Sequence, residues 1–543
     1  MSTTDKRLSR AALPPGIAAA DFADVIAQFQ AAIGKDWVFT SDDDVALYRD
    51  AYSPFWGEGD ERVASAAVAP ANVDEVQAIV RIANAHKVPL YTVSTGRNLA
   101  YGGSAPVMSG CVVVDLKRMN RIIEVSERNA YALVEPGVSY FDLYRYIREN
   151  KLKLWIDCPD PGWGSLIGNA LDHGAGYTQV PYRDHFDAHC GMEVVLANGE
   201  VMRTGMGALP GAKTWQQFKY GMGPIVDGLF AQSNMGVVTK MGFWLMPEPE
   251  AFRSITVAAP RYEDIIPFID IMSNLTYAGV IRSQTQIVSP VFHGDRDAEL
   301  NGLLTKPGGG AAEEYNAYAK ARNLMFWTGR FTFHGLQGVI DAEVAHVRER
   351  FSAIAGATFT DGPAYRFPLT DEEIAKVNDP APLGVPSLKV FGLGRPLDRY
   401  VPDDGHMDFS PVIPMTGEAI LELIHTFAQA FHEMGVTPSV GWPQSYHTRT
   451  LVVIHSFPIT HDPEQNRKTR EAFARMIDIS AAHGWAEYRV HATMQDKAIG
   501  AYAFNDHVLH RFHETLKDAV DPNGILSPGR YSLWPKHMRE ARR

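Results

Sequence analysis

Apolar and polar residues alternate in the first half of the chain with the periods of helices and short strands. Within residues 74–86 the apolar side chains are spaced three and four apart, as in an amphipathic helix: Val76, Ile79, Val80 and Ala83. The apolar runs VPLYTV (88–93) and CVVVDL (111–116) read as strands, and they enclose a loop rich in glycine, serine and asparagine. The pattern therefore predicts helix, strand, tight loop and strand in that order.

The elements that follow complete a first α+β region. Residues 121–137 predict a strand, a turn and a second strand, and residues 139–150 predict a helix. Asn198-Gly199 lies between alternating apolar residues within 192–205, which is a strong signal for a β-hairpin. An apolar run at 236–249 ends this region.

From about residue 254 the pattern changes to long helices that alternate with strands. Helices are expected at 262–274, 336–352, 416–434 and 463–484, and strands at 254–260 and 449–457. The last segment, DAVDPNGILSPGRYSLWP, is rich in turn residues, which is typical of a docked tail rather than a free end. With 543 residues the chain exceeds one ordinary core, so we expect an α+β protein of two domains.

Composition and charge exclude several classes of partner. Lys and Arg number 51 and Asp and Glu number 63, which gives a formal net charge of −12. This balance argues against a nucleic-acid surface and against binding to an anionic membrane. The sequence has neither a secretory leader nor an apolar stretch of spanning length, and it ends in REARR rather than a peroxisomal signal, so a cytoplasmic location is the default expectation.

Familiar catalytic and metal-binding motifs are missing from the sequence. The three cysteines, Cys111, Cys158 and Cys190, lack CxxC spacing, which predicts buried thiols in a reducing compartment and no metal site. A strict GxGxxG, a P-loop, HExxH and GxSxG are also absent. The loop at 94–103 is different, because its glycines let the chain curl and present backbone N–H groups to an anion.

Several longer segments strengthen the interpretation of that loop. In chain order they are VEPGVSYFDLYRYI, PDPGWGSLIGNALDHGAGY, GMEVVLANGEVMRTG and QSNMGVVTKMGFWLMP. With these blocks the sequence resembles the vanillyl-alcohol oxidase and 4-cresol dehydrogenase family of flavoproteins, from about residue 20 to the PGRYSLWP tail. The resemblance implies an FAD-binding domain formed by residues 1–253 and 488–543, with a substrate-binding α/β cap domain at 254–487 inserted between them.

The resemblance also implies which residues hold FAD. The loop would wrap the diphosphate, and His406 in YVPDDGHMDFSP would bind the flavin covalently, since a neutral imidazole is a good nucleophile. The full set implied for the cofactor is Ser94, Thr95, Gly96, Arg97, Asn98, Leu99, Gly102, Pro136, Gly137, Ser165, Gly168, Asn169, Gly176, Tyr177, Val237, Val238, His406 and Arg530. A histidine that assists this attachment in the family is replaced here by Ser53.

Four further residues match the catalytic positions of the family. Tyr101, Tyr488 and Arg489 would bind a phenol as its phenolate, because two hydroxyl donors and a permanent cation stabilise that anion. Asp160 would lie beside flavin N5, where its carboxylate would offset positive charge on the substrate carbon and act as a base toward water or the substrate hydroxyl. Asp157, three residues earlier, is interpreted as a turn-forming residue.

These roles imply an oxidase of para-substituted phenols. Hydride would pass from the benzylic carbon to flavin N5, leaving a p-quinone methide that becomes an aldehyde or ketone or adds water. Dioxygen would then reoxidise the flavin and give hydrogen peroxide. The family tends toward homodimers and larger even assemblies.

Three departures from the family pattern bear on this expectation. Ala100 replaces a glycine before the loop tyrosine, and its methyl group could hinder the access of oxygen to the flavin. The segment GYTQVPYRDH is about two residues longer than its counterparts in the family. Asp408 stands where relatives carry Phe or Gly, and with Thr437 and Ser439 it indicates a polar substrate pocket, although a surface position for Asp408 is an equal alternative.

Other functions remain open from the sequence. A dehydrogenase would share the first half-reaction but pass its electrons to a cytochrome or another acceptor. A sugar or lactone oxidase of the same broad fold is disfavoured, because its substrate has no phenolate for Tyr101, Tyr488 and Arg489 to stabilise. A catalytically inactive flavin-binding protein is disfavoured because every catalytic position is filled.

Overall fold

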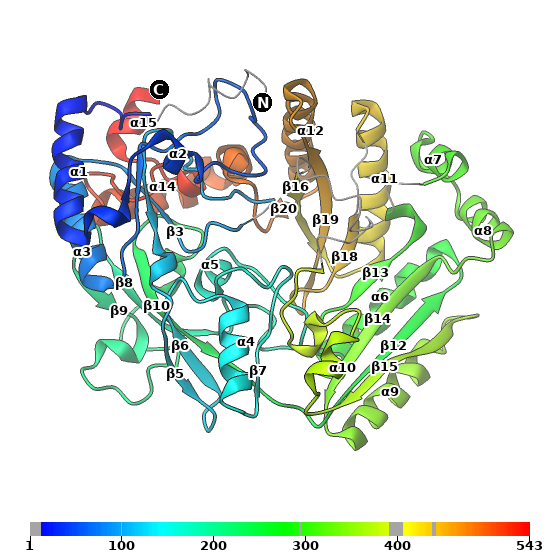
Figure 1. Cartoon of the computed structure of the whole chain (residues 1–543). Coiled ribbons are helices and arrows are strands. Elements are labelled where there is room, and N and C mark those ends of the chain that lie inside the picture. Colours follow the sequence, from blue (N-terminus) through cyan, green and yellow to red (C-terminus); the bar gives the residue numbers. More distant parts are fainter. Residues whose placement is uncertain (1–11, 99, 293–295, 390–404, 437–440, 543) are drawn as a thin grey trace.

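The first part of the chain forms a small mixed sheet, mostly parallel, that is covered by helices. The computed structural model describes residues 12–98, 100–292, 296–389, 405–436 and 441–542 (Figure 1). Its first sheet has the order β1 (Val38–Phe39), β2 (Ala66–Val68), β4 (Val112–Asp115) and β3 (Leu90–Val93), with β2, β4 and β3 parallel. Helices α1 (Ala19–Ile33) and α3 (Val73–His86) pack together and share a core with the sheet. The apolar stripe expected within 74–86 is the buried face of α3.

A five-stranded antiparallel sheet follows. Its order is β5 (Ile122–Ser126), β6 (Tyr131–Val134), β10 (Val237–Trp244), β8 (His189–Val195) and β9 (Val201–Arg203). Strands β8 and β9 pair through Val195 and Val201 and confirm the expected hairpin. A capping box between Ser139 and Asp142 starts α4 (Tyr140–Glu149), which shares a core with this sheet and with α5 (Leu166–Leu171). The short strands β7 (Leu154–Trp155) and β11 (Met246–Pro247) pair separately.

The third sheet has nine strands and occupies the other side of the molecule (Figure 1). Its main path is β15 (Thr358–Arg366), β12 (Ala251–Ala259), β14 (Trp327–Gly335), β13 (Gln286–Val288), β18 (Gly441–Gln444), β19 (Thr450–Ile459), β17 (Pro411–Pro414) and β20 (Ala486–Glu487). Strand β16 (Gly405–Phe409) also pairs with β19.

One face of this sheet packs on four long helices. These are α6 (Ile265–Tyr277), α9 (Gln337–Phe351), α11 (Gly417–Met434) and α12 (Pro463–Ala482), and they form one apolar core with the sheet. Alternate residues of β19 face that core: Leu451, Val453, Phe457 and Ile459 belong to it, and His455 between them packs on Phe427. Because side chains alternate across a strand, Ser456 and its neighbours two residues away lie on the opposite face.

The C-terminal segment returns to the first sheet. The Leu90 N–H donates to the Ile525 carbonyl at 2.7 Å, and the Ser527 N–H donates to the Leu90 carbonyl at 2.9 Å. Ile525 and Leu526 belong to the same core as α1 and α3, which confirms the expected docked tail. The remaining helices are α2 (Asp42–Ala46), α7 (Ala298–Thr305), α8 (Ala312–Ala321), α10 (Asp371–Ala375), α13 (Gln495–Gly500), α14 (Phe504–Val520) and α15 (Lys536–Arg542).

The elements agree with the sequence pattern in type and differ in their ends. The helix expected at 262–274 begins at Ile265, because residues 262–264 form a 3-10 turn. All three cysteines are buried, as expected. Strand β12 begins at Ala251, but the division of the chain into domains at 253 and 487 stays a prediction. Within the described ranges every helix is too short or too polar to cross a lipid bilayer.

Candidate active site

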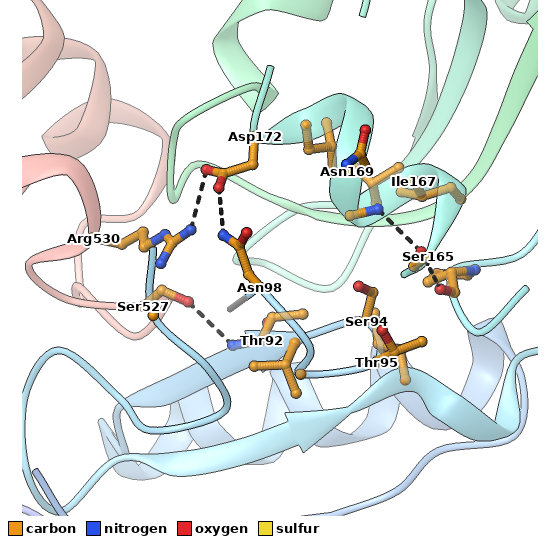
Figure 2. Close-up of a pocket in the computed structure, with 18 of the residues that line it drawn as sticks. Thr92, Ser94, Thr95, Asn98, Ser165, Ile167, Asn169, Asp172, Ser527 and Arg530 are labelled. Atoms are coloured by element: carbon orange, nitrogen blue, oxygen red, sulfur yellow. Dashed lines mark hydrogen bonds and ion pairs between the residues drawn. The ribbon is translucent and has the colours of Figure 1, made fainter. Parts of the chain in front are cut away.

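A cavity lies where the loop after β3 meets the start of α5 and the C-terminal segment (Figure 2). Many residues implied for the cofactor line it: Ser94, Thr95, Gly96, Arg97, Asn98, Gly102, Pro136, Ser165, Gly168, Asn169, Val238 and Arg530. They come from segments as much as 436 residues apart, from Ser94 to Arg530. The fold therefore gathers most of the implied set around one cavity.

Close backbone packing explains the glycines in this cavity. Gly96 has φ +66, and a Cβ there would lie 1.9 Å from Ser104 Oγ. A Cβ on Gly168 would lie 2.2 Å from Ser94 Oγ. The Ser165 hydroxyl fixes the start of α5, since it accepts from the Gly168 N–H at 3.1 Å and donates to the Pro136 carbonyl at 2.6 Å. Gly168 thus lets the start of α5 lie close to Ser94 in the first loop, and Gly96 lets that loop fold back on Ser104.

Asp172 joins three of these segments. Its carboxylate accepts from Asn98 Nδ2 at 2.5 Å, from Arg530 Nη2 at 3.3 Å and from the Tyr531 hydroxyl (Figure 2). Arg530 also donates to the Tyr91 hydroxyl at 3.1 Å. Asp172 is buried, so this ion pair with Arg530 is shielded from solvent and holds the C-terminal segment against the loop.

Other residues implied for the cofactor lie outside the lining of the cavity. Gly137 and Gly176 are packing positions, since a Cβ would lie 2.4 Å from the Lys117 carbonyl and 1.7 Å from Asp157 Oδ2, respectively. Val237 belongs to the core beneath the first sheet. The cofactor roles of these residues, and of Tyr177 and His406, stay predictions. Leu99, Thr437 and Ser439 lie outside the described residues.

Tyr101, Tyr488 and Arg489 form one cluster. The two tyrosine rings meet edge to face with centroids 6.3 Å apart, and the Arg489 guanidinium carbon lies 4.0 Å from the Tyr101 centroid and 5.1 Å from that of Tyr488. The Tyr101 hydroxyl lies 3.0 Å from Ser410 Oγ, and Tyr446 packs against Tyr488 with centroids 6.2 Å apart. Nε of Arg489 is buried and has no hydrogen-bond partner among the described residues.

Burial determines the protonation states of this cluster. It raises the pKa of Tyr101 well above its usual value and also raises that of Tyr488, although Arg489 opposes both shifts. Burial alone would lower the pKa of Arg489, but the neighbouring Tyr488 and Tyr101 raise it overall. The cluster therefore presents two hydroxyl donors and one permanent cation.

Asp160 and Asp157 have different surroundings. Burial raises the pKa of the Tyr177 hydroxyl, and the negative charge of nearby Asp160 raises it further. Asp157 accepts from the Thr178 N–H at 2.7 Å and lies 2.8 Å from His185 Nε2, and both partners are buried. The interpretation of Asp157 as a turn-forming residue is therefore wrong, because it fastens a separate segment of the chain.

His406 and Asp408 project from the same face of β16. Asp408 Oδ1 accepts from Ser456 Oγ at 2.5 Å and lies 3.8 Å from His406 Nε2. The Asp408 side chain is 13% exposed, which excludes the alternative of a surface position. The Tyr52 ring lies 5.2 Å from the His406 ring, between centroids.

Sequence reasoning missed several residues of this region. Asp172, Ser410 and Tyr446 carry no local signal, because their partners are far away in the sequence. Glu487 directly precedes the Tyr488-Arg489 pair and accepts from the Ser410 N–H at 2.6 Å. Burial, and then Asp408, raise the pKa of Glu487 well above its usual value. Its position beside two implied catalytic residues was the one available clue.

Comparison with known proteins identifies the relatives of this chain. A family model described as an FAD binding domain matches residues 64–205, and one described as the C-terminal domain of FAD linked oxidases matches residues 415–531. The 4-cresol dehydrogenase [hydroxylating] flavoprotein subunit of Pseudomonas putida is 35% identical over 97% of this chain and 98% of its own length.

Two solved structures are similar over nearly the whole chain. A 4-ethylphenol oxidase from Gulosibacter chungangensis, in complex with isoeugenol, gives a TM-score of 0.83 at 34% identity and covers 97% of this chain and 100% of its own. A p-cresol methylhydroxylase with substrate bound gives a TM-score of 0.83 at 34% identity, covering 96% and 99%.

The cavity fits the FAD that this family binds. Loops at 94–98 and 164–169 approach each other without Cβ atoms in the way, as a ligand held by backbone amides requires. The chain therefore belongs to the vanillyl-alcohol oxidase and 4-cresol dehydrogenase family of FAD-binding oxidoreductases.

Proposed function

We propose that this protein is an FAD-dependent oxidase of para-substituted phenols, such as 4-alkylphenols and 4-hydroxybenzylic alcohols. One observation carries the proposal: Arg489 packs against the rings of Tyr101 and Tyr488, with a buried Nε that has no hydrogen-bond partner among the described residues. A shielded cation beside two protonated hydroxyls is suited to a small aromatic anion. The names of the relatives, which act on cresol and ethylphenol, support the same substrate class.

The side chains divide the chemistry between them. The Tyr101 and Tyr488 hydroxyls donate to the phenolic oxygen, and Arg489 offsets its charge, so that the substrate loses its proton on binding. Ser410 fixes the Tyr101 hydroxyl. Asp160 offsets positive charge on the benzylic carbon and serves as a base toward water or the substrate hydroxyl. FAD, when bound, accepts the hydride that leaves this carbon.

A dehydrogenase is the second candidate, and Ala100 is the observation that favours it. Ala100 is buried with φ +69, and it immediately precedes Tyr101. A methyl group at this point narrows the approach of dioxygen to a flavin held by the loop. One relative is named as the flavoprotein subunit of a dehydrogenase. If this chain is a dehydrogenase, its partner is an electron acceptor; if it is an oxidase, the expected assembly is a homodimer or a larger even oligomer.

Anaerobic mixing followed by exposure to air tests both candidates. The purified protein is mixed with 4-ethylphenol or vanillyl alcohol without oxygen, and the flavin absorbance is followed. Bleaching and then rapid recolouring with peroxide is the result expected of the oxidase. Bleaching with slow recolouring would indicate the dehydrogenase, and unbleached flavin with both phenols would refute the substrate class.

A further inference from the structure

His406 and Asp408 form a pair on the face of the nine-stranded sheet opposite its helices. Met407 and Phe409, which alternate with them along β16, enter the core against those helices. The Asp408 N–H contacts the Ala100 carbonyl at 3.5 Å, so this part of β16 lies against the loop that lines the cavity. The pair therefore lies on the face away from the helices, in a strand that is adjacent to the loop.

The carboxylate of this pair is held in place. Asp408 lies opposite Ser456 in the β16–β19 register, and Ser456 Oγ donates to Asp408 Oδ1 at 2.5 Å. The same oxygen lies 3.8 Å from His406 Nε2. The Asp408 side chain is 13% exposed and that of His406 is 40% exposed, so the carboxylate is the more shielded member. A shielded carboxylate acts more strongly on a nearby cation than one in open water.

Tyr52 limits the position of the imidazole on another side. Its ring centroid lies 5.2 Å from that of His406, at an interplanar angle of 48°. The strand approaches Tyr52 so closely that a Cβ on Gly405 would lie 2.5 Å from a Tyr52 ring carbon. His406 is thus placed by an aromatic ring and a carboxylate, both of which are held by their own neighbours.

We infer that Asp408 is a positioning and charge-balancing residue for covalent attachment of the flavin to His406. The inference rests on the proposed function and on the expectation, implied by the family resemblance, that the flavin attaches to His406. When a neutral imidazole forms a bond to carbon through one nitrogen, the ring becomes a cation until its remaining N–H proton leaves. Asp408 stabilises that cation and accepts the proton. Ser53, which replaces the assisting histidine of the family, has no group that ionises near neutral pH to do this.

The attachment step balances with dioxygen as the oxidant. A bond forms between an imidazole nitrogen and the 8α carbon of the flavin, and one N–H bond of His406 and one C–H bond of the 8α methyl group break. The two electrons and two protons released reduce the isoalloxazine. Dioxygen then takes them up as hydrogen peroxide, which returns the attached flavin to its oxidised form.

The test measures covalent attachment itself and not turnover. Apoprotein is mixed with FAD in air, and at set times the chain is precipitated with acid and its retained flavin is measured by absorbance and intact mass. Asp408→Asn keeps the size of the side chain and removes its charge, and Ser456→Ala releases the carboxylate. Glu422→Gln is the matched control, because Glu422 pairs with His483 at 2.7 Å elsewhere on the same domain.

We expect Asp408→Asn to slow attachment at least tenfold and Ser456→Ala to slow it less, while Glu422→Gln attaches flavin at the parental rate. Flavin that is bound but lost on acid precipitation shows that each variant is folded. Attachment at the parental rate in both Asp408→Asn and Ser456→Ala would overturn the inference, as would a parental protein that retains no flavin. Anaerobic bleaching of the non-covalently bound flavin by 4-ethylphenol tests the substrate proposal separately.

Discussion

Replacing Arg489 with methionine should remove most of the catalytic efficiency toward phenols. Arg489 Cζ lies 4.0 Å from the Tyr101 ring centroid and 5.1 Å from that of Tyr488, and its Nε is buried. In the proposed complex this guanidinium is the main positive charge beside the phenolate. Methionine keeps much of the volume and removes the charge, so the substrate anion would be buried without a partner.

The size of the effect follows from the burial of the pair. Removing one partner of a buried charge pair costs about 3–5 kcal/mol, and about 1.4 kcal/mol corresponds to a factor of ten in rate. We therefore expect kcat/KM for 4-ethylphenol to fall by roughly two to nearly four powers of ten. Arg489→Lys should lose less, because lysine keeps the charge but not the planar donor fork.

The pH dependence separates loss of charge from loss of packing. A free phenol has a pKa of about 10, and the guanidinium lowers it on binding. Without Arg489 the substrate should ionise only at higher pH, so the ascending limb of kcat/KM should move upward in pH. Anaerobic flavin reduction followed by stopped flow between pH 7 and 10 measures both effects.

Arg253→Met serves as the control for that experiment. Arg253 forms ion pairs with Asp341 and Asp361 that are largely exposed to solvent, so its loss should change kcat/KM by less than a factor of two. The reasoning would be refuted if Arg489→Met lost less than tenfold and kept the parental pH profile. That result would mean that the substrate does not bind as its anion beside Arg489.

Three further predictions concern the loop, its support and the C-terminal segment. Ala100→Gly should speed the reaction of the reduced flavin with dioxygen, followed by stopped flow, because it removes a methyl group at φ +69; an unchanged rate would contradict this. Gly137→Ala should weaken FAD retention and lower stability by about 1–3 kcal/mol, since its Cβ would lie 2.4 Å from a backbone carbonyl. Gly338→Ala, in α9 and away from the cavity, should be tolerated because a Cβ there meets no atom within 4 Å. Lys517→Met should cost about 3–5 kcal/mol in urea unfolding because it leaves the buried Asp521 carboxylate without its counter-ion, and a cost under 1 kcal/mol would contradict the reasoning.

The sequence was informative where structure is local. The stripe within 74–86, Asn198-Gly199 and the alternation of β19 each depend on residues a few positions apart, and those elements formed as expected. Contacts between distant residues left no such trace. Asp172 lies 358 residues from Arg530, and no local pattern indicates that one carboxylate joins them.

Asp157 and Asp408 illustrate the same limit in the site itself. A polar residue near proline and glycine is typical of a turn, yet Asp157 is buried because Thr178 and His185 reach it. Asp408 was assigned to the substrate pocket or to the surface, but its two neighbours, His406 and Ser456, follow from the alternation of β16 and from the register that places Ser456 opposite it. Sheet register depends on residues about 50 positions away, beyond the range of any periodicity argument.

In the proposed function, the loop at 94–103 links cofactor binding to substrate binding. Its first half lines the cavity implied for FAD, and its second half carries Tyr101 to Arg489 and Ser410. The C-terminal segment holds both ends of this arrangement, since Arg530 binds Asp172 and the Ala492 N–H donates to the Tyr101 carbonyl at 3.1 Å. A disturbance of the tail should therefore weaken FAD retention and phenol binding together, whereas a change at Arg489 alone should affect only the phenol.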